Sequence, residues 1–164
     1  MRLSRVMNNK ADQPSSASLW LAYLAKGGTM KELRNLDQCQ LDAIYRVAFA
    51  QFNSGHYTDA LKVFRHLCLL DHTSYSYFLG LGLSQYELSL FAQAAATLAH
   101  GAKLDQKDPR ASLMMAKCFI EIERWSLAQK ALSEAVTRAS QSARWKDELQ
   151  QAKKLTSFVR GKLQ

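Results

Sequence analysis

The four histidines and three cysteines are among the side chains of this chain that could act as nucleophiles, proton carriers or metal ligands. Cys68 and His72 lie four residues apart, which on a helix could hold a metal ion, but no second pair is near them in the sequence. No Ser, Cys and acid cluster and no Gly-rich phosphate loop accompanies the histidines. We therefore predict no enzyme, no metal and no cofactor, and reduced cysteines that pack in the interior.

Aromatic side chains at helical spacing indicate a binding surface rather than a catalytic site. Tyr45, Phe49 and Phe52 are separated by four and three residues, so on a helix they share one side. Aromatic rings supply rigid contact area at a low entropic cost, and Tyr keeps a polar tip for a peptide backbone. This triplet therefore favours the binding of another polypeptide, provided that the fold leaves it uncovered.

A repeat period of 34 residues predicts the helices that would position these aromatics. Tyr57, Phe91 and Trp125 are separated by this step. Small residues where two helices cross, with an aromatic at the turn between them, are what a tetratricopeptide helical hairpin requires. Four columns in phase over three units argue against chance coincidence in an ordinary helical bundle. The other three columns are Ala60, Ala94 and Ala128; Phe64, Leu98 and Leu132; and Ala48, Gly82 and Ala116.

The fold class predicted from this period is all-α, a tetratricopeptide-repeat α-solenoid of three helical hairpins. Three units are about the minimum for a stable stack, and the terminal units need capping. The expected parts are a flexible segment 1–17 and one domain 18–164, made of N-terminal helices in 18–40, repeats 41–74, 75–108 and 109–142, and a capping helix in 143–164.

Capping and turn signals agree with these divisions. Asp37 with Gln40 predicts a helix start at the first repeat, Asp108 with Pro109 predicts one at the third, and Gly55 follows Ser54 in the expected first hairpin turn. The remaining signals are a hydrophobic staple of Leu36 and Leu41, a helix 19–26 stopped by Gly27 and Gly28, a capping box of Thr29 and Glu32, and an apolar stripe of Trp145, Leu149, Ala152, Leu155 and Val159 on the capping helix.

The first helix of each repeat is expected to line the concave face of the array. Positions 5, 9 and 12 of each repeat lie on one side of that helix. Packing inside the hairpins is already supplied by other positions, so this side is left over for a partner segment with apolar anchors. The alternative is burial beneath the N-terminal or the capping helix; it stays open for the leucines, whereas the aromatics favour binding. The nine predicted groove residues are Tyr45, Phe49, Phe52, Leu79, Leu83, Tyr86, Leu113, Lys117 and Ile120.

The net charge of +8 is concentrated in the C-terminal third, where Lys and Arg outnumber Asp and Glu from Pro109 to Gln164. Such an excess can attract nucleic acid or an acidic partner. However, this segment mixes charge signs and carries apolar residues at helical spacing, which favours a solvated helix face. No apolar run approaches the roughly 18–20 residues of a membrane-spanning helix, and the first residues do not form a secretory signal. We expect a cytoplasmic protein without membrane insertion.

Four segments make the sequence resemble a known family. In order and spacing they are LAKGGTMKEL, YRVAFAQFNSGHYTDALKVF, LDHTSYSYFLGLG and DPRAS. Together they resemble the class II chaperones of bacterial type III secretion, the LcrH/SycD type, over roughly Tyr23–Leu132. The GGT, LDH and FLGLG motifs make the resemblance more specific than the repeat alone, because the generic repeat does not require them.

This resemblance implies a cytoplasmic chaperone that binds the hydrophobic translocator proteins and keeps them soluble and separate before export. It also implies groove aromatics at Tyr45, Phe49 and Phe52, and self-association through the N-terminal region. The alternative is a regulatory or scaffolding adaptor whose groove binds a soluble protein. A third hypothesis, a nucleic-acid binder, is disfavoured because the C-terminal basic residues are not interleaved with exposed aromatics and no helix-turn-helix signature is present.

Overall fold

The computed structural model describes residues 22–23 and 25–164, without the side chain of Leu33. Within this part of the chain the regular structure is helical and contains no strand. The segment 1–17 that was expected to be flexible lies outside the described residues, as does much of the helix expected over 19–26. Gly27 has a φ of 89° and the amide of Gly28 donates to the carbonyl of Tyr23, so the chain turns at the predicted glycines.

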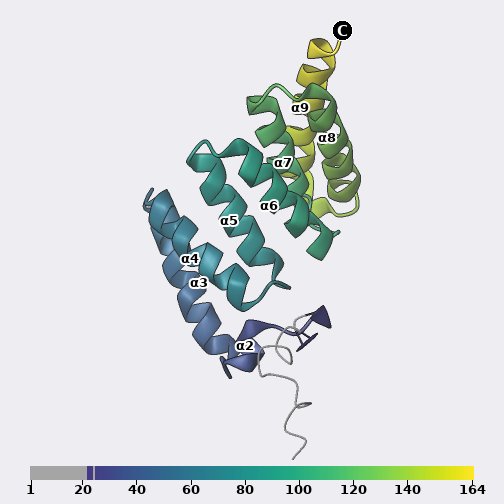
Figure 1. Ribbon diagram of the computed structural model, residues 1–164. Helices are drawn as coiled ribbons and strands as arrows, with labels where there is room; N and C mark the ends of the chain where they lie inside the picture. Colours follow the sequence, from purple (N-terminus) through teal and green to yellow (C-terminus); the bar gives the residue numbers. More distant parts are fainter. Residues whose placement is uncertain (1–21, 24) are drawn as a thin grey trace, which may run out of the picture.

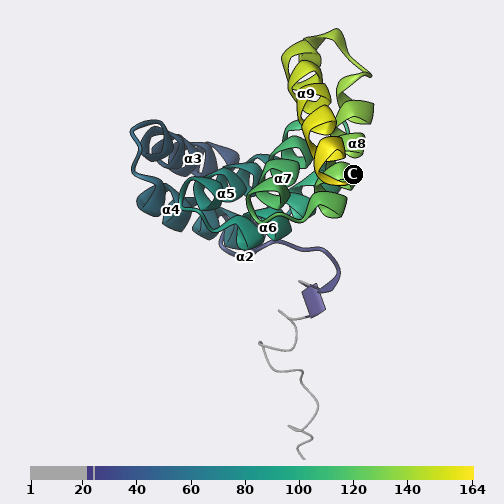
Figure 2. The same ribbon diagram turned by 90° about the horizontal axis from the view of Figure 1, so that it is seen from above.

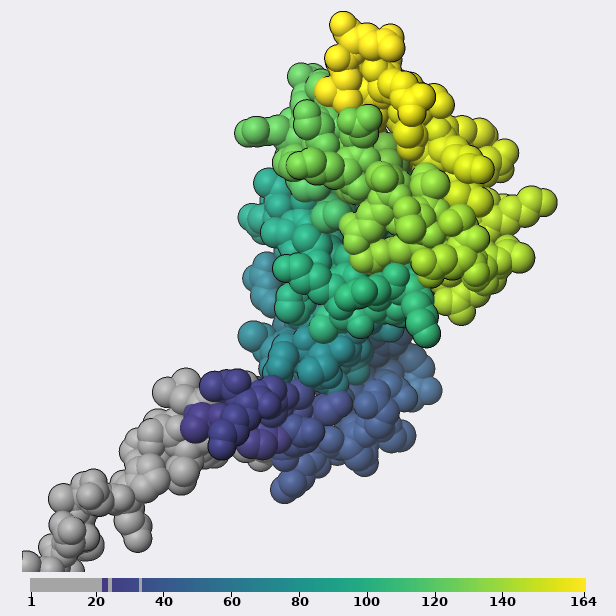
Figure 3. Space-filling model, turned by 90° about the vertical axis from the view of Figure 1, so that its right-hand side faces the viewer, coloured from purple at the N-terminus to yellow at the C-terminus, as the bar shows by residue number. Residues whose placement is uncertain are grey.

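Three helical hairpins follow one another and stack in chain order (Figures 1 and 3). Their second helices begin at Tyr57, Phe91 and Trp125, which confirms the 34-residue period. The elements are α2 (Met30–Leu33), α3 (Gln38–Asn53), α4 (Tyr57–Leu70), α5 (Tyr75–Glu87), α6 (Phe91–Leu104), α7 (Arg110–Glu121), α8 (Trp125–Ala139), the 3-10 turn η1 (Ala143–Trp145) and α9 (Lys146–Lys162).

Side-chain caps start α3 and α7, as predicted. Asp37 accepts a hydrogen bond from the amide of Gln40 at 2.8 Å, and the Gln40 side chain accepts from the amide of Asp37 at 3.0 Å. Asp108 accepts from the amide of Arg110 at 2.9 Å, and Pro109 already has right-handed helical dihedral angles. Helix α7 begins at Arg110, one residue later than expected, and α3 begins at Gln38, three residues before the expected repeat.

Helix α2, which directly follows the GGT motif, packs beside α4, at whose end the LDH motif begins. The amide of Thr29 donates to the Glu32 carboxylate at 2.9 Å, which is one half of the predicted capping box. Lys31 forms an ion pair with Asp71, and Asp71 also accepts from the amide of Thr73 at 3.0 Å. Burial opposes ionisation of Asp71, but these hydrogen bonds outweigh it and hold its pKa below the usual value. Asp71 therefore shapes the turn between the first two repeats and fastens α2 to it.

A left-handed residue ends the first helix of every hairpin. Gly55, Ser89 and Glu123 have φ values of 78°, 59° and 55°, and they are again 34 residues apart. In each turn this residue and the next donate backbone hydrogen bonds to the last helical turn, as His56 does to Gln51 at 2.9 Å. This is the Schellman pattern, which satisfies carbonyls at the end of a helix. Its recurrence fixes the same entry angle for all three second helices.

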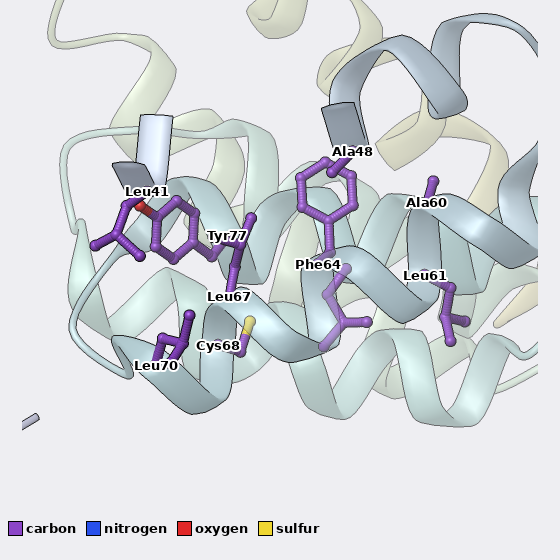
Figure 4. Packing of buried hydrophobic residues seen from close by; sticks show 10 residues of the cluster. Leu41, Ala48, Ala60, Leu61, Phe64, Leu67, Cys68, Leu70 and Tyr77 are labelled. Atoms are coloured by element: carbon purple, nitrogen blue, oxygen red, sulfur yellow. The ribbon is translucent and has the colours of Figure 1, made fainter. Parts of the chain in front are cut away.

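Each hairpin is held by a large apolar residue that packs onto a small one. Phe64, 1% exposed, points from α4 toward Ala48 of α3, which is fully buried (Figure 4). In the second hairpin a Cβ atom on Gly82 would lie 2.5 Å from Cγ of Leu98, so only glycine fits. Phe64 also fills the space above Gly80 in the next repeat, where an added Cβ would lie 2.4 Å from its ring. The predicted small residues Ala48 and Gly82 are therefore contact points within the hairpins, and Gly80, which lies outside the predicted columns, is a contact point between repeats.

Helix α9 packs against α8 and covers the end of the array (Figure 1). Ala152 and Val159 of the predicted stripe are fully buried, and Leu155 packs against the same core. That core also contains Leu132 of α8, so α9 buries the apolar face of the third repeat that would otherwise meet water. Among the described residues, no helix combines the length and apolarity that a membrane crossing needs.

The cysteines are free thiols, and two of them are buried. Burial raises the pKa of the Cys68 and Cys118 thiols to about 12, so both are protonated at neutral pH. Cys39, near the start of α3, is exposed, so the prediction that the cysteines pack in the interior is wrong for this one. No group of three potential metal ligands comes together within the part of the chain that the structure describes.

Two glycine-to-alanine substitutions should have opposite effects on stability. Both add a methyl group to a helix and gain helix propensity of up to about 1 kcal/mol. At Gly82 the methyl group would overlap buried Leu98, so we expect a net loss of about 1–2 kcal/mol in the free energy of unfolding. At Gly161 nothing lies within 4 Å of the new Cβ, so Gly161→Ala should be neutral or stabilising. Chemical denaturation measures both, and equal effects would contradict the close crossing of α5 and α6.

Candidate peptide-binding groove

The first helices of the repeats lie along the inner side of a curved array. Figure 2 shows α3, α5 and α7 on this side, with α4, α6 and α8 on the outer side and α9 at one end. This is the predicted concave face. A segment crossing it would meet the three inner helices in turn.

A cleft of about 100 Å³ lies between the first and second repeats on this face. The cleft has an aromatic wall from α3 and an aliphatic wall from α5, with Phe64 also in its lining. Five of the nine predicted groove residues line it together: Tyr45, Phe49, Phe52, Leu79 and Leu83.

The aromatic wall combines an exposed ring with a supported one. Phe49 is 50% exposed and stacks on Tyr45 with ring centroids 6.2 Å apart. Tyr45 in turn meets Phe64 edge-on at 5.8 Å and Tyr77 at 5.9 Å, which fixes its position against the core. Phe49 thus offers apolar area that the fold itself does not use, whereas Tyr45 serves both the core and the cleft.

The two aromatics at position 12 also pack within their own hairpins. Phe52 meets Tyr57 edge-on at 5.3 Å, and Tyr86 meets Phe91 in the same way at 5.4 Å. The Tyr86 hydroxyl is 3.5 Å from a carboxylate oxygen of Glu121, to which it donates. Both rings are partly buried, so they stabilise the hairpin turn as well as bordering the groove.

The third repeat presents less apolar surface than the spacing predicts. Leu113 is 3% exposed and belongs to the core that includes Ala152 and Val159 of α9. This agrees with the alternative given above, in which the leucines are buried by the capping helix. Leu79, although it lines the cleft, is only 8% exposed. Ile120 is partly buried against the third-repeat core.

Position 2 of the repeats contributes residues that the sequence reasoning did not include. Ser76 and Arg110 both line the cleft and are 34 residues apart. Position 2 lies three residues before position 5, so helical spacing already places it on the same side of the helix. Helical spacing therefore indicated position 2 as well, but the prediction included only positions 5, 9 and 12 of that side.

Arg110 is held in place by strong partners. Its Nε atom lies 3.0 Å and 3.1 Å from the two carboxylate oxygens of Asp108, and its guanidinium group lies 5.4 Å from the ring centre of Trp145. Asp108 is 3% exposed. Burial opposes its ionisation, but the hydrogen bonds from Arg110 outweigh that effect and hold the pKa of Asp108 below its usual value. The positive charge at the mouth of the cleft is therefore compensated within the fold.

No family model matches the chain, but several known proteins do. The chain is 35% identical over 111 residues to low calcium response locus protein H of Yersinia pestis, a match that spans 68% of this chain and 66% of that protein, just under two thirds of its length. The type III secretion translocator chaperone SycD of Yersinia enterocolitica matches with a TM-score of 0.75 and 30% identity, over 80% of this chain and 98% of SycD. PcrH, solved with the chaperone binding region of PopD, matches with a TM-score of 0.77 and 29% identity, over 79% of this chain and 97% of PcrH.

Sequence identity to SycD along nearly all of that structure decides the family. The chain belongs to the translocator chaperones of type III secretion. The resemblance described from the sequence and the all-helical repeat fold are both confirmed. Translocator chaperones are not enzymes, in agreement with the sequence-based prediction.

Replacement of Asp108 should change how stability depends on pH. A carboxylate whose pKa is lowered by folding stabilises the native state above its unfolded pKa of about 3.9, and this contribution is lost as the pH falls through the folded pKa. At pH 7 we expect Asp108→Asn to cost about 1–2 kcal/mol, because Asn accepts weaker hydrogen bonds from Arg110. The deficit should shrink in acid, where wild-type Asp108 is itself protonated.

Thermal unfolding followed by circular dichroism at neutral and acidic pH measures this difference. Asp59→Asn is the control, because Asp59 forms an exposed ion pair with Lys62 that contributes little. A deficit for Asp108→Asn that is the same at both pH values would contradict the role of the carboxylate.

Proposed function

We propose that the chain is a cytoplasmic chaperone that holds an extended segment of a hydrophobic translocator protein in its concave groove and so keeps the translocator soluble before export. The observation that carries this proposal is the aromatic cleft between α3 and α5, which opens on the face toward which the repeats curve. Family membership supplies the class of client.

The relatives support both the client and the mode of binding. PcrH has been solved with the chaperone binding region of PopD, and SycD with a peptide of the translocator YopD. Here the cleft is lined by rings and aliphatic side chains, with the hydroxyl group of Ser76 and the guanidinium group of Arg110 at its border. Apolar anchors of an extended segment would fill the cleft, while its backbone would meet these polar groups.

Phe49 is the groove residue that is expected to contribute most to the free energy of client binding. Half of its surface is exposed in the free chaperone, so binding would remove apolar area from water without disturbing the core. A rigid, exposed aromatic beside a cleft has the properties of an interface hot spot. The alternative of an adaptor for a soluble signalling protein uses the same groove and differs only in the identity of the client.

Self-association through the N-terminal region is a further part of this proposal. One structure of SycD is described as an alternative dimer. Most of the corresponding N-terminal region lies outside the described residues of this chain. Light scattering on the full chain and on a form lacking residues 1–21 would test whether that region is needed for a dimer.

Co-purification tests the class of client. The tagged chaperone, isolated from the cytoplasm of its native bacterium, should retain a translocator that carries long apolar segments, identifiable by mass spectrometry. Co-expression should keep that translocator in the soluble fraction. Recovery of a soluble signalling protein in place of a translocator would favour the adaptor alternative.

Replacement of Phe49 tests the site. Phe49→Ala should weaken capture of the co-purified translocator by about 1–4 kcal/mol, in the range of aromatic hot spots, and should leave thermal stability almost unchanged because the ring is half exposed. Val47→Ala is a matched control, since Val47 lies on α3, is 53% exposed and lies about 200° away around the helix. Full affinity of Phe49→Ala for the translocator would place the binding site elsewhere.

A further inference from the structure

Lys117 is the one charged side chain among the nine predicted groove residues. It occupies position 9 of the third repeat, where the first two repeats have Phe49 and Leu83. On α7 it lies seven residues beyond Arg110, which is about two helical turns, so both residues lie on nearly the same side of the helix. Because Arg110 lines the cleft, Lys117 continues the same face toward the C-terminal end of α7.

The charge of Lys117 has no partner within the described part of the chain. The side chain is partly buried and forms no ion pair there. Glu87, at the end of α5, is the carboxylate that acts on it electrostatically, and it lies beyond ion-pair distance. Burial lowers the pKa of Lys117, and Glu87 offsets this only in part. The free chaperone thus holds a partly desolvated ammonium group on its inner face.

Arg110 shows that such a charge can be compensated within this fold. Its guanidinium group pairs with Asp108 through several short hydrogen bonds, at distances down to 2.6 Å. No equivalent carboxylate accompanies Lys117, although it lies on the same helix. At position 9 the first two repeats therefore offer an apolar side chain, and the third adds a positive charge that has no ion-pair partner among the described residues.

We propose that the client segment carries an Asp or Glu side chain that pairs with Lys117, at a short distance from the apolar anchors that fill the cleft. This inference rests on the proposed function. A carboxylate would restore the interactions that the ammonium group loses on burial, and such pairs at an interface discriminate strongly between partners.

The geometry also predicts where in the client this acid lies. The seven residues from Arg110 to Lys117 span about 10 Å of helix. An extended chain advances about 3.3 Å per residue. For a segment that turns to follow α7 over this stretch, the acid is expected about three residues from the anchor that sits beside Arg110. A client with a basic or bulky apolar residue at that place would be rejected by charge repulsion or by the loss of water around Lys117.

Lys117→Met tests this proposal because methionine keeps the length of the side chain and removes its charge. The probe is a synthetic peptide of the translocator segment that co-purifies with the chaperone, together with variants in which each Asp or Glu is replaced by Asn or Gln. Calorimetry should show about tenfold weaker binding of the unmodified peptide to Lys117→Met than to the wild type. Lys117→Arg should bind within a few-fold of the wild type.

The peptide variants identify the pairing. One acid-to-amide replacement should weaken binding to the wild type by a similar factor and should have little further effect on Lys117→Met, because both changes remove the same pair. Lys130→Met, an exposed lysine on the second helix of the same repeat, is the control and should bind like the wild type. Thermal stability of Lys117→Met should equal or exceed that of the wild type, since a desolvated charge is removed.

Three outcomes separate the inference from the function on which it rests. Unchanged or tighter peptide binding by Lys117→Met would overturn the pairing and leave the groove assignment intact, provided that Phe49→Ala still binds more weakly than the wild type. Additive losses from the lysine and acid replacements would also overturn it. If the wild-type chaperone captures no translocator segment, the proposed function fails first and the pairing fails with it.

Discussion

The close approach of paired helix backbones at small residues is the constraint on which this structure depends. Phe64 can pack onto Ala48, and Leu98 onto Gly82, only because the small residues leave room for them. This packing occupies one side of each first helix and leaves the side with Phe49 free to face inward. The groove is therefore a by-product of how the hairpins close, and it needs no separate scaffold.

The repeat architecture could be predicted from the sequence because steric limits act at fixed intervals. The positions of Ala48 and Gly82, onto which large side chains pack, and of the turn aromatics such as Tyr57 tolerate few residue types, so the period is visible in the residues themselves. Helix starts were also predictable, since Asp37 and Asp108 act as caps through short-range hydrogen bonds. Helix α3 begins directly after its predicted cap, Asp37, which places its first three residues before the repeat boundary expected at residue 41.

The limits of prediction in the groove have an equally physical origin. Helical spacing shows which side of α7 Leu113 occupies, but not that α9 would pack over it. The same spacing could not show that Phe52 and Tyr86 would contact Tyr57 and Phe91 in their own hairpins. What packs against a given side of a helix depends on the other elements that meet it, whether near or far in the sequence, and periodicity within one helix carries no information about them.

Burial of two of the three cysteines makes the chaperone suited to a single-site label. A maleimide reacts with thiolates, and the thiols of Cys68 and Cys118, with pKa values of about 12, are almost wholly protonated at pH 7 and are shielded from solvent. Cys39 is exposed near the N-terminus of α3, the helix that carries the aromatic wall of the cleft. A fluorophore could therefore be attached to the unaltered sequence at the start of α3 without labelling the two buried thiols.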